Sequence, residues 1–213
     1  MKKITIKNLK ISHEGKSILN VNKIVFCEGL NYITGSNGSG KSTLLKFVAN
    51  VNSNLKINYD LFSLQELKKS IIPMVTQNPI NSVCKELSFM ENLIIYKFSK
   101  KKSLFSFVHQ KKYEEYIINF LKCNNLFDNT NKILHSSVNT LSGGELQILS
   151  IIMRLLKSEE ILLLDEPTAN LDIMNTKKIM ELIMKLVEKK YIIIMVAHDE
   201  KLMQAYAGHH IKL

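Results

Sequence analysis

Apolar residues follow two different patterns along the chain. Near the N-terminus, residues 3–7 alternate as a strand does, and the run from Ser17 to Phe26 is also strand-like. Four later apolar runs show no alternation with polar residues: 30–34, 71–75, 161–164 and 191–197. Continuous apolar runs of this length, separated by helical segments, are typical of a parallel sheet covered on both faces. The sequence therefore predicts an α/β fold.

A helical pattern replaces the strands between about residues 80 and 140. Apolar residues with spacings of three and four are Leu87, Met90, Leu93, Ile94, Tyr113, Tyr116, Ile117, Phe120 and Leu121. We interpret this stretch as a helical lobe inserted into the α/β core, which then comprises about residues 1–79 and 141–213. Further helices are expected at about 44–50, 143–156 and 175–189.

The composition limits the class of protein. With 213 residues, 46% of them hydrophobic and 23% charged, the chain is long enough for one good core, or for one core and a small lobe. No apolar run approaches the roughly 20 residues that a membrane-spanning helix needs, and polar residues interrupt the apolar pattern near the start of the chain. We therefore expect a cytoplasmic protein, and its three widely spaced cysteines fit reduced thiols.

The net charge of +10 would suit a nucleic acid, an anionic membrane surface or a polyphosphate ligand, and charge alone does not choose among them. The clearest local cluster comprises Lys97, Lys100, Lys101, Lys102, Lys111 and Lys112. Apolar residues are interleaved with these lysines, so the basic segment 97–112 is a candidate loop, membrane-facing patch or partner surface. We favour a loop or a partner surface.

A glycine-rich segment after the apolar run 30–34 carries the strongest chemical signal. It consists of Gly35, Ser36, Asn37, Gly38, Ser39, Gly40, Lys41, Ser42 and Thr43, and it fits the pattern G-x-x-x-x-G-K-[ST]. A strand, a glycine-rich turn and a helix in this order aim backbone N–H groups at one point, which suits a phosphate group. Lys41 can reach the β- and γ-phosphates, the Ser42 hydroxyl is placed for Mg²⁺, and Thr43 is placed beside the α-phosphate. A chance surface turn would not explain why strand, turn and helix occur in the required order.

Two carboxylates, Asp165 and Glu166, follow the apolar run 161–164. In an open parallel sheet, ligands bind at the strand ends. Asp165 suits Mg²⁺, directly or through water, and Glu166 suits a general base for the attacking water. The alternative is an ordinary acidic strand end. A glycine-rich loop that binds phosphate requires a second strand that ends in carboxylates. This requirement favours a role for Asp165 and Glu166 in binding Mg²⁺ and in catalysis.

A second pair of glycines lies in Ser142-Gly143-Gly144-Glu145, ahead of an apolar helix. The segment fits a capping box, in which the serine side chain accepts a hydrogen bond from the backbone N–H three residues on, while the glutamate reaches back to the serine.

In combination, these segments resemble the ATP-binding cassette (ABC) ATPases over essentially the whole chain. The glycine-rich segment resembles the Walker A motif, residues 161–166 resemble Walker B, and residues 141–145 resemble the signature motif. Gln77 resembles the Q-loop glutamine, residues 169–172 are similar to the D-loop, and His198 stands where the family has its switch histidine. The signature is the most discriminating of these motifs, since kinases and GTPases lack it.

The resemblance implies a single domain, 1–213, with a P-loop NTPase core, a mixed or parallel sheet, an N-terminal antiparallel β part and the inserted helical subdomain. It also implies that ATP is sandwiched between the Walker A of one subunit and the signature of a second. Ser142, Gly143 and Gly144 would then contact the γ-phosphate held by the partner, and Asp172 would act across the same interface. If the capping box forms in the empty protein, Ser142 must exchange a local hydrogen bond for a phosphate oxygen.

Catalytic roles follow from the same resemblance. Gln77 would sense Mg²⁺ and the attacking water, and His198 would hold the γ-phosphate in the transition state. The expected catalytic set is Lys41, Gln77, Glu166 and His198, and the expected Mg²⁺ set is Ser42, Gln77 and Asp165, with ATP and Mg²⁺ as cofactors.

Three departures from the family accompany the resemblance. The family usually has an aromatic residue before Walker A to stack on adenine, and His13 falls at that position. After the signature, two positions that are usually basic are apolar, within Gln147-Ile148-Leu149 and at Met153. Only 15 residues follow His198, so we expect no C-terminal regulatory domain.

We expect the ATP-hydrolysing subunit of an ABC transporter, peripheral on the cytoplasmic face of the cell membrane, with membrane-spanning subunits on separate chains. A second ABC ATPase subunit would complete a homodimer or a heterodimer. Export is favoured over import by analogy with minimal chains. The alternative is a soluble ABC ATPase of a cytoplasmic assembly, such as iron–sulfur cluster biogenesis. A nucleic-acid-binding protein ranks last, because it rests on basicity alone.

Overall fold

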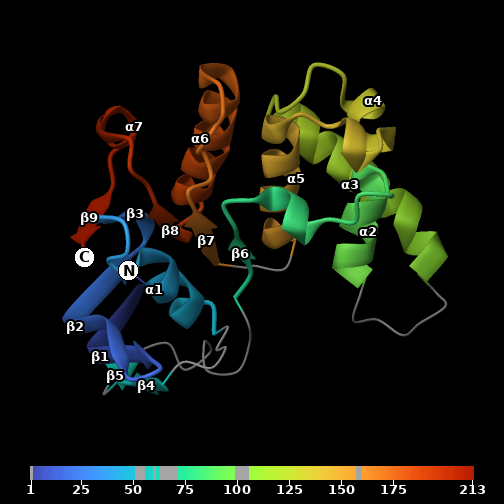
Figure 1. Ribbon diagram of the computed structural model, residues 1–213. Helices are drawn as coiled ribbons and strands as arrows, with labels where there is room; N and C mark the ends of the chain where they lie inside the picture. The colour runs from blue at the N-terminus through green and yellow to red at the C-terminus, as the bar shows by residue number, and fades with distance from the viewer. Residues whose placement is uncertain (1, 51–55, 60, 63–71, 99–105, 157–159) are drawn as a thin grey trace. The chain divides into compact units, whose positions relative to one another are not determined.

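The structure, a computed structural model, describes residues 2–50, 56–59, 61–62, 72–98, 106–156 and 160–213 (Figure 1). The chain forms two compact units. The first comprises Met1–Gln77, Ser158–Pro167 and Ile183–Leu213, and the second comprises Asn78–Lys157 and Thr168–Leu182. The chain therefore passes twice from the first unit into the second and back.

An antiparallel sheet forms the N-terminal part of the first unit, as predicted. Its strands are β1 (Lys3–His13), β2 (Lys16–Cys27), β4 (Lys56–Asn58) and β5 (Leu61–Phe62), in the order β2-β1-β4 with β5 also paired to β1. β1 continues well beyond the predicted residues 3–7. The reason lies at Asn8, whose φ of 50° shifts the alternation of the strand, so that Leu9 and Ile11 are buried as Ile4 and Ile6 are.

A five-stranded parallel sheet, in the order β6-β7-β8-β3-β9, forms the rest of the first unit together with its helices. Its strands are β3 (Gly29–Thr34), β6 (Met74–Val75), β7 (Ile161–Asp165), β8 (Ile192–Val196) and β9 (His209–Lys212), and helices α1 (Lys41–Val48) and α7 (Glu200–Ala205) belong to the same unit. Three of the predicted apolar runs are confirmed as strands β3, β7 and β8. β6 is shorter than the predicted run 71–75, of which residue 71 lies outside the described residues. The sequence pattern does not predict β9, because His209 and His210 interrupt any apolar run.

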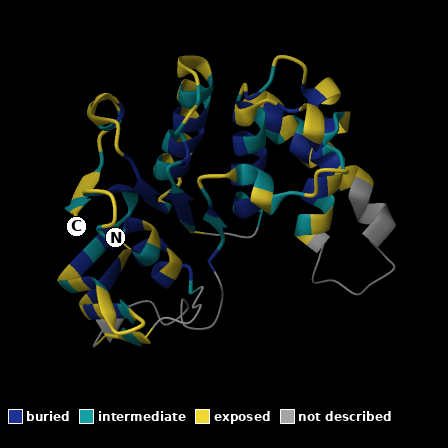
Figure 2. Cartoon of the chain, viewed as in Figure 1, coloured by how far each residue is buried: buried dark blue, intermediate teal, exposed yellow. Residues whose placement is uncertain are grey.

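One buried cluster joins the inner face of the antiparallel sheet, α1 and the parallel sheet. Its members include Ile6, Phe26, Leu44, Leu163 and Ile194, each at most 1% exposed. β8 is buried at all five of its positions, which explains why its sequence is continuously apolar. Figure 2 shows β8 in dark blue. The packing fixes α1, and hence the glycine-rich loop before it, against the end of β3.

The second unit is helical. It contains the short 3₁₀ helices η1 (Pro79–Ser82) and η2 (Val138–Thr140), the helices α2 (Phe89–Phe98), α3 (Ser106–Cys123), α4 (Thr130–His135) and α5 (Gly143–Leu155), and the first part of α6 (Ile173–Glu188). The described residues between 80 and 140 are mainly helical, and the unit also includes α5, which lies beyond the bounds expected for the helical lobe. α5 belongs here because it packs on α2, where Arg154 lies over the Tyr96 ring at 5.4 Å. None of the described helices is both long enough and apolar enough to cross a bilayer.

Apolar burial also explains the departure from the family pattern on α5. Ile148 and Met153 stand where the family is usually basic, and they are 0% and 3% exposed. Both side chains therefore contribute to the interior of this unit.

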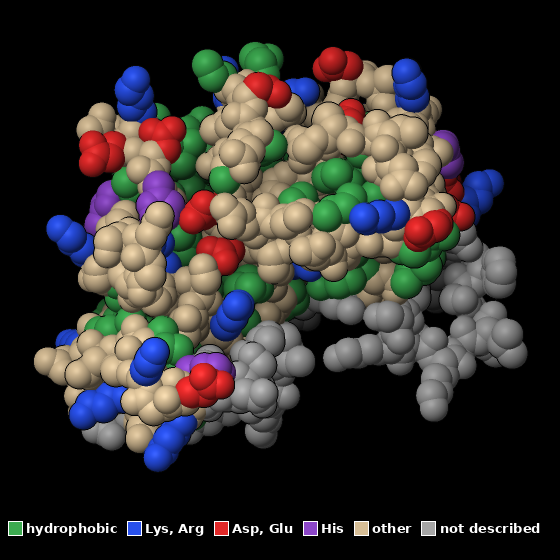
Figure 3. Space-filling view, viewed as in Figure 1, with side chains coloured by type: hydrophobic (Ala, Val, Ile, Leu, Met, Phe, Trp, Pro, Cys, Tyr) green, Lys and Arg blue, Asp and Glu red, His purple; other side chains and the backbone are tan. Residues whose placement is uncertain are grey.

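Lysine side chains are spread over the molecular surface, as Figure 3 shows in blue. Several lie over the antiparallel sheet, where the exposed lysines are Lys3, Lys7, Lys10, Lys16, Lys23 and Lys56. Within the basic segment 97–112, Lys97 lies in α2 and Lys111 and Lys112 lie in α3, while residues 99–105 are outside the described residues. These three lysines therefore lie in helices and not in a loop, and the other favoured interpretation, a partner surface, stays a prediction.

Candidate nucleotide site

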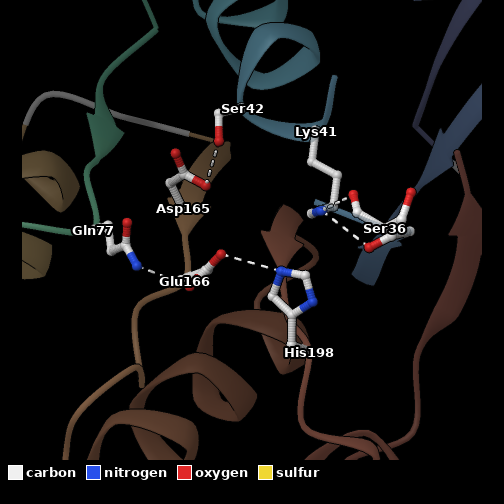
Figure 4. Close-up of polar contacts among 8 residues, drawn as sticks. Ser36, Lys41, Ser42, Gln77, Asp165, Glu166 and His198 are labelled. Atoms are coloured by element: carbon white, nitrogen blue, oxygen red, sulfur yellow. Dashed lines mark hydrogen bonds and ion pairs between the residues drawn. The ribbon is translucent and has the colours of Figure 1, made fainter. Parts of the chain in front are cut away.

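The parallel sheet brings four segments of the first unit to one edge. Because β3, β6, β7 and β8 are parallel, their C-terminal ends lie on the same side of the sheet. β3 leads into the glycine-rich loop, β6 ends two residues before Gln77, β7 ends at Asp165, and β8 ends two residues before His198. Figure 4 shows that these side chains point toward one another.

The glycine-rich loop has the backbone geometry of an anion site. Gly40 has a φ of 95°, and a Cβ added there would lie 3.2 Å from Leu19 Cδ1 and 3.3 Å from the Ile18 carbonyl oxygen. Only glycine suits both the angle and the space. Gly40 also precedes α1 as an N-cap without a side-chain hydrogen bond, and the first turn carries no acidic residue. The N–H groups of this turn are thus directed at the loop, as a phosphate ligand requires.

Of two further side chains at this loop, one is a buried cation bonded only to neutral groups, and the other is a buried hydroxyl without a partner in the described part of the chain. Lys41 is 7% exposed, and its Nζ donates hydrogen bonds to the carbonyl oxygens of Gly35 at 3.0 Å and Ser36 at 2.8 Å. Both acceptors are neutral, and no carboxylate of the described residues forms an ion pair with it. The Ser39 hydroxyl is buried and has no hydrogen-bond partner in the described part of the chain. A buried ammonium and an unpaired hydroxyl both favour an anionic ligand here.

Ser42 and Asp165 meet beside this loop. The Ser42 hydroxyl donates to Asp165 Oδ1 at 3.2 Å. Burial raises the pKa of the Asp165 carboxyl, although the bond from Ser42 works in the opposite direction. Hard oxygen ligands of this kind fit Mg²⁺, which takes one or two protein oxygens and completes its shell with phosphate and water. The described ranges contain no cluster of three or more His, Cys, Asp or Glu that could hold a metal ion.

Glu166 is held between two other predicted catalytic residues. Gln77 Nε2 donates to Glu166 Oε2 at 3.0 Å, and His198 Nε2 lies 3.2 Å from Glu166 Oε1 (Figure 4). The backbone of Glu166 has a φ of 48°, a left-handed angle that is uncommon outside glycine. A carboxylate fixed between an amide and an imidazole, at the end of a buried strand, is well arranged to accept a proton from a water molecule.

His13 is the predicted site residue for which the structure gives the least support. It is exposed at the end of β1, opposite Lys16 of β2. Its side chain forms no hydrogen bond, ion pair or ring contact with the described residues. Adenine stacking by His13 therefore stays a prediction.

The signature segment belongs to the second unit. Ser142 caps α5, where its Oγ accepts from Glu145 N at 3.3 Å and Ser142 N donates to Glu145 Oε2 at 2.7 Å. This confirms the predicted capping box. Ser142 and Gly143 are exposed, and Gly144 is buried. The two exposed residues present the positive end of a 13-residue helix to solvent.

Asp172 precedes α6 and binds a residue that the sequence analysis missed. Asn175 N donates to Asp172 Oδ1 at 2.8 Å, and Asn175 Nδ2 donates to Asp172 Oδ2 at 2.7 Å. These two bonds lower the pKa of the exposed Asp172 carboxyl. The available signal was the spacing Asp-x-x-Asn at the start of a helix, which is a common capping pattern. A cavity of about 500 Å³ in the same unit is lined by Ser142, Glu145 and Asn175, among others.

Known proteins resemble this chain over most of its length. Residues 19–169 match a family model described as ABC transporter. A tyrosine transport ATP-binding protein of Clostridioides difficile is 36% identical over 190 residues, which cover 85% of this chain and 74% of that protein. The phosphate import ATP-binding protein PstB 1 of Lactococcus lactis is 32% identical, covering 92% and 79%. The zinc uptake system ATP-binding protein ZurA of Listeria monocytogenes is 30% identical, covering 100% and 83%.

Solved structures agree on the fold. The dimeric structure of the bacterial ABC transporter cassette MJ0796 has a TM-score of 0.74 at 24% identity, covering 98% of this chain and 94% of that one. A nucleotide-free ATP-binding cassette from an ABC transporter has a TM-score of 0.73 at 19% identity, covering 100% and 88%. At these identities the likeness concerns the fold, and it confirms the predicted fold class.

Proposed function

Since this chain belongs to the ABC transporter family, we propose that it is the ATP-hydrolysing subunit of a transporter whose membrane-spanning parts are separate polypeptides. Proteins of this family are ATPases, and ATP is the nucleotide that they bind. One observation carries the assignment of roles to residues. At one edge of the sheet lie the buried Lys41 and the hydrogen-bonded pair Ser42 and Asp165. Glu166, which is bonded to Gln77 and His198, lies at the same edge.

The glycine-rich loop would bind the triphosphate. Lys41 would exchange its bonds to two neutral carbonyl oxygens for bonds to phosphate oxygens, which are shorter and stronger because both partners are charged. The uncapped first turn of α1 would donate its N–H groups to the same phosphates. Bound Mg²⁺, held by Ser42 and Asp165 and sensed by Gln77, would neutralise phosphate charge.

Glu166 would act as the general base. It would take a proton from a water molecule as the water oxygen attacks the γ-phosphorus, while the bond from that phosphorus to the oxygen bridging to ADP breaks. Gln77 would orient the water, and His198 would donate a hydrogen bond to the γ-phosphate oxygens as charge develops on them. In the structure both residues are bonded to Glu166, so each must release it before these roles begin.

A second cassette would complete the site. Ser142, Gly143 and Gly144 of one copy would contact the γ-phosphate bound by the other, with Asp172 acting across the same interface. The exposed helix N-terminus at Ser142 supports this role. ATP binding would then close the dimer and hydrolysis would reopen it, and the motion would pass to the membrane subunits.

The direction of transport is part of the proposal. The sequence pattern favours export by analogy, whereas two of the three relatives named above are proteins of phosphate import and zinc uptake. The transport assay must therefore measure both uptake and release of solutes. No observation on the described residues favours the alternative of a cytoplasmic assembly ATPase.

The experiment is an affinity capture with Glu166→Gln and ATP from detergent-solubilised membranes of the native host. We expect a multi-spanning protein to be retained with ATP and lost without it. Lys41→Ala in the presence of ATP is the matched control, since it should not form the ATP-bound dimer. Vesicles containing the captured partner and the wild-type chain would then be assayed for ATP-dependent uptake and release of solutes. Capture of soluble proteins alone would contradict the transporter proposal.

A further inference from the structure

We infer that Asn175 is a positioning residue that holds the Asp172 carboxylate and the signature glycine Gly144 in a fixed mutual arrangement. The inference rests on the proposed function, because it concerns the two segments that are expected to act on the nucleotide of a second copy. Asn175 belongs to none of the motifs identified in the sequence.

The Asn175 side chain contacts both segments at once. Its amide nitrogen donates to Asp172 Oδ2 at 2.7 Å, while its backbone nitrogen donates to Oδ1 at 2.8 Å. Both carboxylate oxygens are therefore engaged, which fixes the rotation of the carboxylate as well as its position. The same amide group lies where a side chain at position 144 would begin. A Cβ added to Gly144 would be 2.6 Å from Asn175 Nδ2 and 2.8 Å from Asn175 Oδ1.

An ordinary helix cap accounts for only part of this geometry. A cap at Asp172 requires the backbone N–H of Asn175 and makes no demand on its side chain. The second bond, from the amide to the other carboxylate oxygen, and the close approach to Gly144 are additional. The absence of a side chain at Gly144 is what allows α6 to lie this close to the start of α5.

Two groups that are expected to act across one dimer interface must keep a constant separation. Ser142 and Gly144 start α5, Asp172 precedes α6, and Asn175 is the side chain that bridges these two helix starts. A displacement of about 1 Å in a positioned group can lower a rate by about 100-fold. Without the bridge, each segment would retain its own cap but would lose its relation to the other. The effect should appear when the dimer forms and in turnover, and should leave ATP binding by the single chain unchanged.

The test uses the full chain with Asn175→Asp, which keeps the size of the side chain, removes the donor and places two carboxylates in contact. Asn175→Ala removes the bridge without adding charge. Lys177→Ala is the matched control on the same helix, since Lys177 is exposed and only its 3.9 Å pair with Glu181 is lost. Melting temperature and ATP affinity of the single chain are measured first. ATP-dependent dimerisation is then followed with each variant combined with Glu166→Gln. The values of kcat and KM are measured with the same variants in the chain that retains Glu166.

We expect Asn175→Asp to lower kcat by about 10-fold and to raise the ATP concentration needed for dimerisation by about 10-fold, with ATP affinity of the single chain unchanged. In the background of Asp172→Ala, the same substitution should add little, because the carboxylate it acts through is gone. Wild-type dimerisation and turnover in both Asn175 variants would overturn the inference alone. Failure of Glu166→Gln itself to dimerise with ATP would overturn the proposed sandwich, and the inference with it. A fall in melting temperature with normal kcat and normal dimerisation would show a purely structural role, which also overturns it.

Discussion

The candidate nucleotide site of the first unit and the signature region of the second satisfy their polar groups in different ways. In the first unit, side chains from separate strand ends bond to one another, with Gln77 and His198 on Glu166 and Ser42 on Asp165. In the second unit, the carboxylate of Asp172 and the hydroxyl of Ser142 each bond three residues along the chain. The first arrangement exists only when the parallel sheet has formed, whereas the second needs only the start of a helix.

This difference predicts how substitutions divide between stability and chemistry. A variant at the candidate nucleotide site removes a group that is proposed to serve the ligand, so it should change binding or turnover while the free energy of unfolding changes little. A variant at a cap in the second unit removes a group that also stabilises a helix, so stability and chemistry should change together. The predictions below test that division.

The largest effect is expected for Glu166→Gln. Turnover should fall by about 10²- to 10⁴-fold, the range that loss of a general base produces, with ATP binding intact. Phosphate release at saturating ATP measures turnover, and equilibrium binding measures ATP affinity. Thermal denaturation measures the stability of the variant. Near-normal turnover would contradict the assignment of the base. A large fall in melting temperature would contradict the contrast between the two units.

Lys41→Ala should weaken ATP binding by about 10- to 100-fold, because a charged hydrogen bond is worth about 1.5–3 kcal/mol. Calorimetric titration with ATP measures this effect. Lys10→Ala is the control, since it removes the same charge from an exposed position on β1. If both variants lost affinity equally, the effect would be one of net charge, and the phosphate-clamp interpretation would fail.

Ser142→Ala should lower the free energy of unfolding by about 1 kcal/mol through loss of the α5 cap. It should also weaken ATP-dependent dimerisation in the Glu166→Gln background. Ser142→Thr keeps the hydroxyl and should retain most of the stability. Urea denaturation without nucleotide measures the contribution of the Ser142 cap to stability separately from its proposed contact with the nucleotide. An unchanged unfolding midpoint would show that the capping box contributes nothing to the fold.

The smallest expected effect is the pH dependence of stability that Asp172 contributes at acidic pH. Its hydrogen bonds from Asn175 lower its pKa in the folded protein, so its contribution to stability is present above its ordinary pKa of about 3.9 and is lost as the pH falls through the lowered value. Asp172→Asn cannot titrate. The difference in melting temperature between this variant and wild type should therefore shrink as the pH is lowered from 5 toward about 3. A difference that stays constant over this range would contradict the sign of the shift.

The sequence predicted those parts of the fold whose cause is local. The apolar runs that became β3, β7 and β8 are buried on both faces, and such burial leaves a visible pattern. The capping box at Ser142 needs only residues within one turn, and it was predicted correctly. By contrast, β9 owes its existence to pairing with β3, and the extension of β1 depends on a single left-handed residue at Asn8. Neither cause is visible in a local pattern.

The candidate site shows the same division. The spacing of motifs identified Lys41, Gln77, Glu166 and His198, but it gave no sign that Gln77 and His198 both bind Glu166, because that contact depends on the order of strands in the sheet. Asn175 was missed for a related reason. Its capping position is local, whereas its contact with Gly144 joins two residues that are 31 positions apart in the chain.

The left-handed backbone at position 166 creates a trade-off between thermal stability and ATP hydrolysis. A glutamate pays a conformational penalty at a φ of 48°, and glycine would not. Glycine at 166 should therefore give a chain that withstands more heat and hydrolyses almost no ATP. A selection for heat resistance alone, applied to a random library of this protein, would be expected to enrich variants that have lost the catalytic base.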